Sequence, residues 1–131
     1  EGVSHFLYVA WNAGHDKPVS LLELEMQAEV DKFIVSYWLL RRQLPGHFPL
    51  ELRRALFART RLDPRLSARS AAMYREASRY AERFCGRLES RLERGRARAV
   101  GCGHEAEVLS ELRRFYRLTN TRKRAHIERT A

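Results

Sequence analysis

The chain has 131 residues, of which 44% are hydrophobic, a size and composition that suit one domain with a single apolar core. Its 25 Lys and Arg against 16 Asp and Glu give a formal charge of +9, which favours polyanions or acidic protein surfaces as partners. Two cysteines are too few for a disulfide scaffold, and no apolar run approaches the roughly 20 residues that cross a bilayer, so we expect a cytoplasmic protein without membrane contact.

The charge is divided unevenly along the chain. Residues 1–40 hold six acidic and two basic side chains, whereas residues 41–131 hold 23 basic and ten acidic ones. Because the excess of cations lies in the later two-thirds, any surface that attracts polyanions is expected there.

Residues 1–17 are interpreted as an N-terminal arm, because they hold apolar side chains without helical spacing. The spacing does not decide among an extended segment, a short strand and an irregular lid. Such an arm could dock a groove of its own domain or of a partner chain. We expect a helical bundle domain over residues 18–120 and a basic C-terminal tail over residues 121–131.

A capping box at residues 20–23, Ser-Leu-Leu-Glu, predicts a helix that begins at Leu21, and two prolines and a glycine after Gln43 predict its end. The helix carries two apolar stripes, which are formed by Leu22, Met26, Val30, Phe33, Tyr37 and Leu40 and by Leu21, Leu24, Ala28, Val35 and Leu39. The second stripe is buried either inside the bundle or against another subunit. We therefore place Leu21–Gln43 at the centre and expect it to be the contact of a homodimer.

The remaining helices follow in chain order. Pro49 opens a short helix to about residue 59, and Asp63 with Pro64 predicts the start of the longest helix, which reaches about residue 94. Its inward face consists of Met73, Ala77, Tyr80, Ala81, Phe84, Leu88 and Leu92. A glycine-rich connector over residues 95–103 precedes a last helix over about 105–118, with Val108, Leu109, Leu112, Phe115 and Tyr116 at its core edge. The sequence predicts an all-α fold, a compact helical bundle of three long helices and one short helix.

The longest predicted helix carries five arginines at successive i,i+4 positions, Arg75, Arg79, Arg83, Arg87 and Arg91. Like charges at this spacing cost roughly 0.2–0.5 kcal/mol per pair, so something is expected to neutralise them. One candidate is the phosphate backbone of a nucleic acid. The other is neutralisation by carboxylates of this protein, for which Glu23, Glu25, Glu29 and Asp31 of the first predicted helix are available if the two helices pack side by side.

A second basic concentration lies near the C-terminus and consists of Arg113, Arg114, Arg117, Arg122, Lys123 and Arg124. Basic ends of this kind commonly contact nucleic acid and also serve as solubilising tails. No aromatic residue follows Tyr116, so the pattern does not indicate base stacking. These six residues, with Arg75, Arg79, Arg83 and Arg87, form the predicted nucleic-acid-binding set.

Evidence for catalysis is weak. Five histidines are scattered singly, without a second His or Cys at metal-ligand spacing. His104 lies near Cys102 and Glu107, but mixed polar groups beside glycines are typical of an exposed turn. Glu25 and Glu29 lack the accompanying ExxH motif of a di-metal bundle. We expect no catalytic residue, no cofactor and no metal site.

The leading hypothesis is a small, non-enzymatic protein that binds nucleic acid mainly through phosphate contacts. The alternative is a protein–protein interaction module, such as an adaptor, chaperone or regulatory subunit, whose basic face meets an acidic partner. The two hypotheses differ in one observable, because only the first predicts affinity for a random duplex or single strand at low salt.

Overall fold

The computed structural model describes residues 2–58, 62–97 and 103–129, and within these ranges the chain is entirely helical apart from turns and loops. The helices are α1 (Gly2–Ala13), α2 (Leu21–Gln43), α3 (Leu52–Ala58), α4 (Ala68–Ala97), α5 (Gly103–Arg117) and α6 (Asn120–Arg129). The predicted all-α class is confirmed. The predicted number of helices is wrong, because both ends of the chain contribute a helix.

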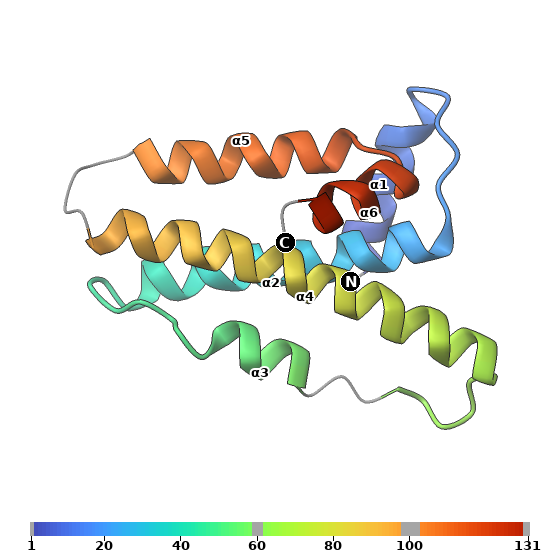
Figure 1. Ribbon diagram of the computed structural model, residues 1–131, viewed down its shortest axis with the longest axis horizontal. Helices are drawn as coiled ribbons and strands as arrows, with labels where there is room; N and C mark the ends of the chain where they lie inside the picture. The colour runs from blue at the N-terminus through green and yellow to red at the C-terminus, as the bar shows by residue number, and fades with distance from the viewer. Residues whose placement is uncertain (1, 59–61, 98–102, 130–131) are drawn as a thin grey trace.

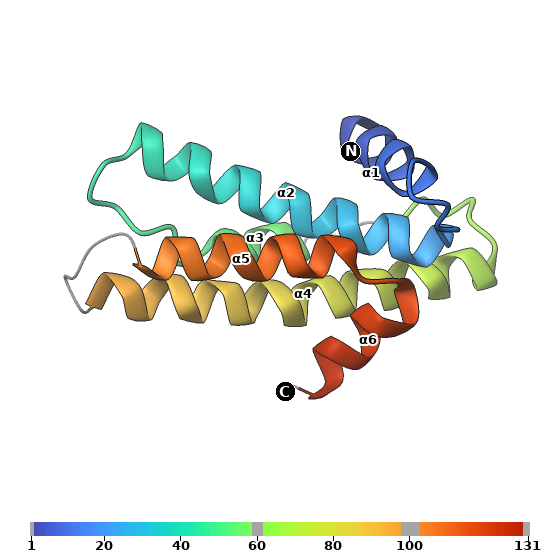
Figure 2. The ribbon, with the colours of Figure 1, turned by 90° about the horizontal axis from the view of Figure 1, so that it is seen from above.

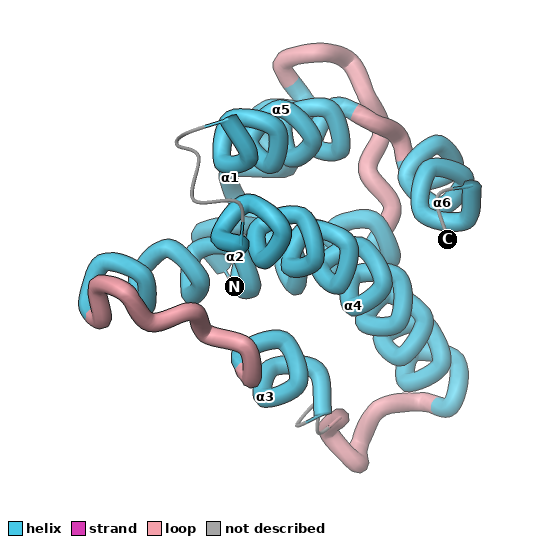
Figure 3. The backbone as a smooth tube through the Cα atoms, turned by 60° about the vertical axis from the view of Figure 1, so that its left-hand side comes forward, coloured by secondary structure: helices cyan, strands magenta, loops and turns pink. Residues whose placement is uncertain are grey.

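The two longest helices, α2 and α4, pack against each other and form the middle of the bundle (Figure 1). The α5 helix packs on α4 on one side, and α3 packs on both central helices on the opposite side (Figure 3). The α1 and α6 helices lie at the end where α2 begins (Figure 2). The core between these elements contains Met26, Val30, Phe33, Tyr37, Phe57, Ala77, Tyr80, Ala81, Phe84, Leu88, Leu92, Val108, Phe115 and Ile127.

The α2 helix begins and ends where the sequence predicts. Ser20 is its N-cap, and the Ser20 hydroxyl accepts a hydrogen bond from the Glu23 amide at 3.2 Å. The first apolar stripe faces the core, whereas Val35 and Leu39 of the second stripe are 55% and 50% exposed. Because α1 packs on α2, part of this second side meets an element of the same chain. The homodimer contact stays a prediction.

The expected N-terminal arm is a helix, which none of the three alternatives included. The apolar residues of α1 do have helical spacing, but Val3, Phe6 and Leu7 lie on its exposed side. The side that packs inward is polar and includes the buried Tyr8 and Asn12. The sequence interpretation that these residues lack helical spacing is therefore wrong, because Val3, Phe6 and Leu7 follow the i,i+3,i+4 pattern of a helix.

The longest helix begins later than predicted. Asp63 closes a turn instead of capping a helix, since its carboxylate accepts from the Arg65 amide at 2.9 Å and its carbonyl accepts from the Leu66 amide at 3.1 Å. Ser67 is the cap of α4, and its hydroxyl accepts from the Ser70 amide at 3.1 Å. The predicted inward face is confirmed, with Met73 half-buried and the other positions buried. In α5, the predicted core residue Leu109 is instead 40% exposed.

Gly95 belongs to α4 and not to a connector, and it lies where α4 closely approaches α5. A Cβ atom added at Gly95 would be 2.6 Å from the Cβ of His104, closer than two carbon atoms pack. We expect Gly95→Ala to lower the free energy of unfolding by about 1–2 kcal/mol in urea denaturation, despite the better helix propensity of alanine. Gly86→Ala is the matched control, because its added carbon would meet Arg53 only at 3.6 Å. Equal stability of the two variants would contradict this close contact.

Candidate functional site

The row of arginines on α4 does not form one continuous surface. Arg75, Arg79 and Arg83 are exposed, and the Arg79 guanidinium lies 5.6 Å from the centre of the Tyr80 ring. Their side chains have no carboxylate within 4 Å among the described residues. These three arginines therefore remain available to an external anion.

The other two members of the row contact the protein itself. Arg87 is half-buried, its Nη1 donates to the carbonyl of His126 at 3.4 Å, and burial lowers the pKa of its guanidinium. Its Nη2 is buried without a hydrogen-bond partner in the described part of the chain. Arg91 Nη1 lies 3.7 Å from a carboxylate oxygen of Glu111 on α5. Arg87 and Arg91 thus join α4 to its neighbouring helices.

The second basic concentration is only partly exposed. Arg113, Arg114 and Arg117 on α5 and Arg122 on α6 are exposed, and none has a carboxylate within 4 Å in the ranges that the structure describes. Arg124, in contrast, contacts α4. Its Nη2 lies 3.1 Å from the carboxylate of Glu76, and its Nε donates to the Tyr80 hydroxyl at 3.3 Å. The exposed, unpaired arginines of the described residues therefore lie on α5 and α6 as well as on α4.

Lys123 contradicts its predicted role, because it is fully buried and cannot reach a phosphate. Its Nζ donates to Gln27 Oε1 at 2.5 Å and lies 4.4 Å from the Tyr8 ring centre and 4.7 Å from that of Phe115. Burial lowers the pKa of this amine to about 7, although the charge of Glu23 opposes the change. The residue is a structural contact between α6 and the start of the bundle.

Internal pairing of the α4 arginine row comes from Glu111 on α5, whereas Glu23, Glu29 and Asp31 of α2 have other partners. Glu23 accepts from the Tyr8 hydroxyl at 2.5 Å, and Asp31 accepts from Ser4 and, at 2.8 Å, from Gln27 Nε2. This internal polar cluster joins α1 to α2. Its sequence signal is the i,i+4 spacing of Glu23, Gln27 and Asp31, which places three polar side chains on one side of α2.

The acidic positions that remain on α2 also have partners away from α4. The carboxylate of Glu25 lies 3.7 Å from the ring of His5, and that of Glu29 lies 2.8 Å from the Lys32 amine. The carboxylates of α2 thus contact side chains of α1 and, in the case of Glu29, a lysine of α2 itself. As a consequence, the exposed arginines elsewhere keep most of the positive charge of the protein.

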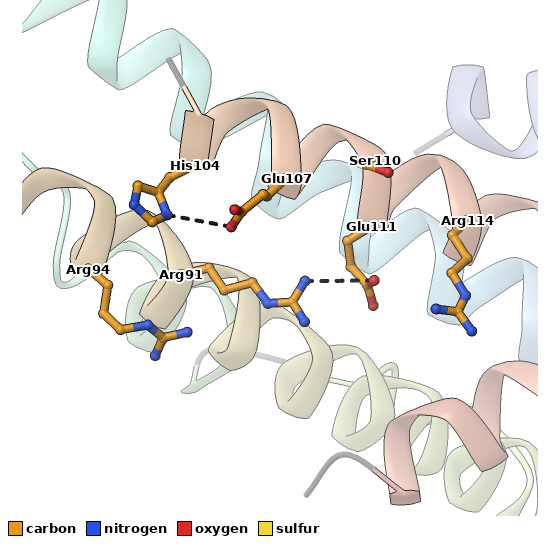
Figure 4. Close-up of a pocket in the computed structure, with 7 residues that line it drawn as sticks. All are labelled: Arg91, Arg94, His104, Glu107, Ser110, Glu111 and Arg114. Carbon is orange, nitrogen blue, oxygen red and sulfur yellow. Dashed lines mark ion pairs between the residues drawn. The ribbon is translucent and has the colours of Figure 1, made fainter. Parts of the chain in front are cut away.

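An open polar groove of about 480 Å³ lies between the later half of α4 and the first part of α5. Figure 4 shows its lining side chains, which are Arg91, Arg94, His104, Glu107, Ser110, Glu111 and Arg114. Of these, only Arg114 belongs to the predicted nucleic-acid-binding set. The groove was missed because its two sides come from separate helices, and no spacing along the chain relates them.

Both carboxylates in this groove have basic partners. Glu107 lies 3.5 Å from His104 Nδ1, and Glu111 lies 2.5 Å from His126 Nε2 as well as 3.7 Å from Arg91. Arg94 and Arg114 are exposed and have no carboxylate within 4 Å among the described residues. Three arginines against two glutamates give the groove a positive formal charge even with its histidine neutral.

Comparisons with protein-family models, with curated proteins and with solved structures find no match to this chain. Within the described ranges, no group of three or more His, Cys, Asp or Glu side chains is arranged to hold a metal ion. No helix there combines the length and the apolar character needed to cross a membrane. The arrangement of charged side chains thus provides the main basis for a functional proposal.

Proposed function

We propose that the protein is a non-enzymatic, cytoplasmic binder of nucleic acid that acts mainly through phosphate contacts. The observation that carries this proposal is a set of exposed arginines, without a carboxylate within 4 Å in the described residues, on three neighbouring helices. They are Arg75, Arg79, Arg83, Arg113, Arg114, Arg117 and Arg122. Each such guanidinium can release a condensed counterion when it contacts a phosphate, which favours association at low salt.

A charge-reversal variant tests this function. Replacing Arg79 and Arg83 with Glu is expected to weaken binding of a random-sequence nucleic acid by about tenfold or more and to flatten the slope of log affinity against log salt. Fluorescence anisotropy over a salt series measures both quantities. Arg42→Glu with Arg69→Glu is the control, because it makes the same charge change at exposed arginines outside the proposed interface.

The salt slope decides between a specific surface and net charge alone. An unchanged salt slope in the Arg79 and Arg83 variant, or an equal loss of affinity in the control variant, would contradict the assignment of binding to this surface. Absence of binding to either duplex or single strand by the unmodified protein at low salt would reject the proposed function altogether.

A second candidate is a protein–protein interaction module with an acidic partner. It is favoured by the outer side of α1, where Val3 is 75% and Phe6 is 71% exposed. Monomeric proteins rarely leave neighbouring apolar side chains of this size uncovered. This function replaces the first if the purified protein has no affinity for nucleic acid at low salt.

A further inference from the structure

We propose that the groove between α4 and α5 binds the backbone of single-stranded nucleic acid, and that it makes the protein prefer single strands to duplexes. This inference rests on the proposed function and adds the class of nucleic acid and the place where it binds. The groove lies between Arg91 and Arg94 on one side and Arg114 on the other (Figure 4). A strand lying in it would meet cations from both helices.

The charge of the groove fits a phosphate backbone. The groove is lined by three arginines and two glutamates, so its formal charge is positive even when its histidine is neutral, and Glu111 is paired with Arg91. Arg94 and Arg114 keep their guanidinium groups unpaired in the described part of the chain. A planar guanidinium can donate two parallel hydrogen bonds to one phosphate, so Arg94 and Arg114 can each hold a phosphate at opposite ends of the groove (Figure 4).

The shape of the groove distinguishes between the two classes of nucleic acid. Packed helices are separated by only about 8–10 Å between axes, so the depression between them is too narrow to admit a duplex. A volume of about 480 Å³ falls in the range of sites that hold a small molecule or a single nucleotide. A duplex can therefore contact only the outer edges of the groove, whereas a flexible single strand can lie along its base.

Arg83 lies on nearly the same side of α4 as the groove. Arg83 and Arg94 are eleven residues apart, and eleven steps of about 100° bring a helix to within roughly 20° of the same side. Arg87, between them along the helix, contacts the His126 carbonyl of α6, so Arg83 offers a separate phosphate contact on this side of α4.

Two variants with equal charge change test the groove. We would measure anisotropy of a labelled ~15-nucleotide single strand and of the duplex of the same sequence, a length that matches known single-strand sites. Arg94→Ser with Arg114→Ser is expected to weaken single-strand binding about tenfold while changing duplex binding by less than about threefold. Arg42→Ser with Arg69→Ser is expected to change both only slightly. All four side chains are exposed, so circular dichroism melts should match those of the unmodified protein.

The outcomes separate this inference from the proposed function. Stronger binding of the single strand, lost selectively in the groove variant, supports the groove. Equal affinity of the two variants for the single strand, or a preference of the unmodified protein for duplex, overturns the groove while leaving nucleic-acid binding intact. No binding of either probe by the unmodified protein rejects both.

Discussion

Lys123→Met is expected to make the protein more stable than the unmodified chain at pH 7, by about 1–2 kcal/mol in urea denaturation. The Lys123 amine is fully buried against Tyr8 and Phe115, and removing it relieves the cost of excluding an ammonium group from water. Methionine keeps a similar length and apolar character. The gain is reduced because Gln27 Oε1 loses its hydrogen-bond donor and the buried Glu23 carboxylate loses a nearby cation.

The advantage of the Lys123→Met variant is expected to disappear as the pH rises. Burial lowers the pKa of Lys123 from 10.5 to about 7. Between these two values the unfolded chain binds a proton that the folded protein does not, so the free energy of unfolding rises with pH. A full difference of one proton gives about 1.4 kcal/mol per pH unit, so the unmodified protein should gain about 2 kcal/mol on the variant between pH 7 and pH 9.

The difference between the two proteins isolates the lysine from other groups that titrate nearby. Burial raises the pKa values of Cys85 and Tyr8, but both side chains are present in the two proteins. Lys32→Met is the matched control, because Lys32 is exposed and lies 2.8 Å from the carboxylate of Glu29. A stability difference that stays constant from pH 7 to pH 9 for Lys123→Met would show that its amine is hydrated in solution.

The sequence was a good guide to helices that bury apolar side chains. The α2 boundaries follow from the Ser20 cap and the prolines after Gln43, and the core side of α4 follows from the spacing of its apolar residues. The terminal helices were missed for two different reasons. In α1 the helical spacing of Val3, Phe6 and Leu7 was overlooked, and it lies on the exposed side of the helix. In α6 a buried lysine occupies a core position, whereas a charged residue is expected in solvent.

The candidate site was only partly predictable, because the partners of its charged side chains come from other helices. Exposure of Arg79, Arg83 and Arg114 agrees with a basic surface, because charged residues default to solvent. The partners of Arg91 and Arg124 come from other helices, and such pairing across the bundle depends on the packing of the elements. Local spacing does not encode that packing, so it neither identified the paired arginines nor located the α4–α5 groove.

Tyr8→Phe is expected to destabilise the protein by about 2–3 kcal/mol, the cost of removing a donor from a buried charged acceptor. The Tyr8 hydroxyl donates to Glu23 at 2.5 Å, and the Glu23 side chain is only 2% exposed, so water cannot readily replace the lost donor. Tyr116→Phe is the control. Its ring packs edge-on against Tyr8 with 4.9 Å between centres and is only half-buried, so we expect a loss below about 1 kcal/mol.

A double-mutant cycle with Glu23→Gln identifies the source of this loss. A glutamine at this position carries no charge, so the absence of the Tyr8 hydroxyl should matter less to it than to a carboxylate. The double variant is therefore expected to be more stable than the sum of the single changes predicts, by about 1–2 kcal/mol in urea denaturation. Additive losses would mean that Tyr8 stabilises the bundle through its ring alone.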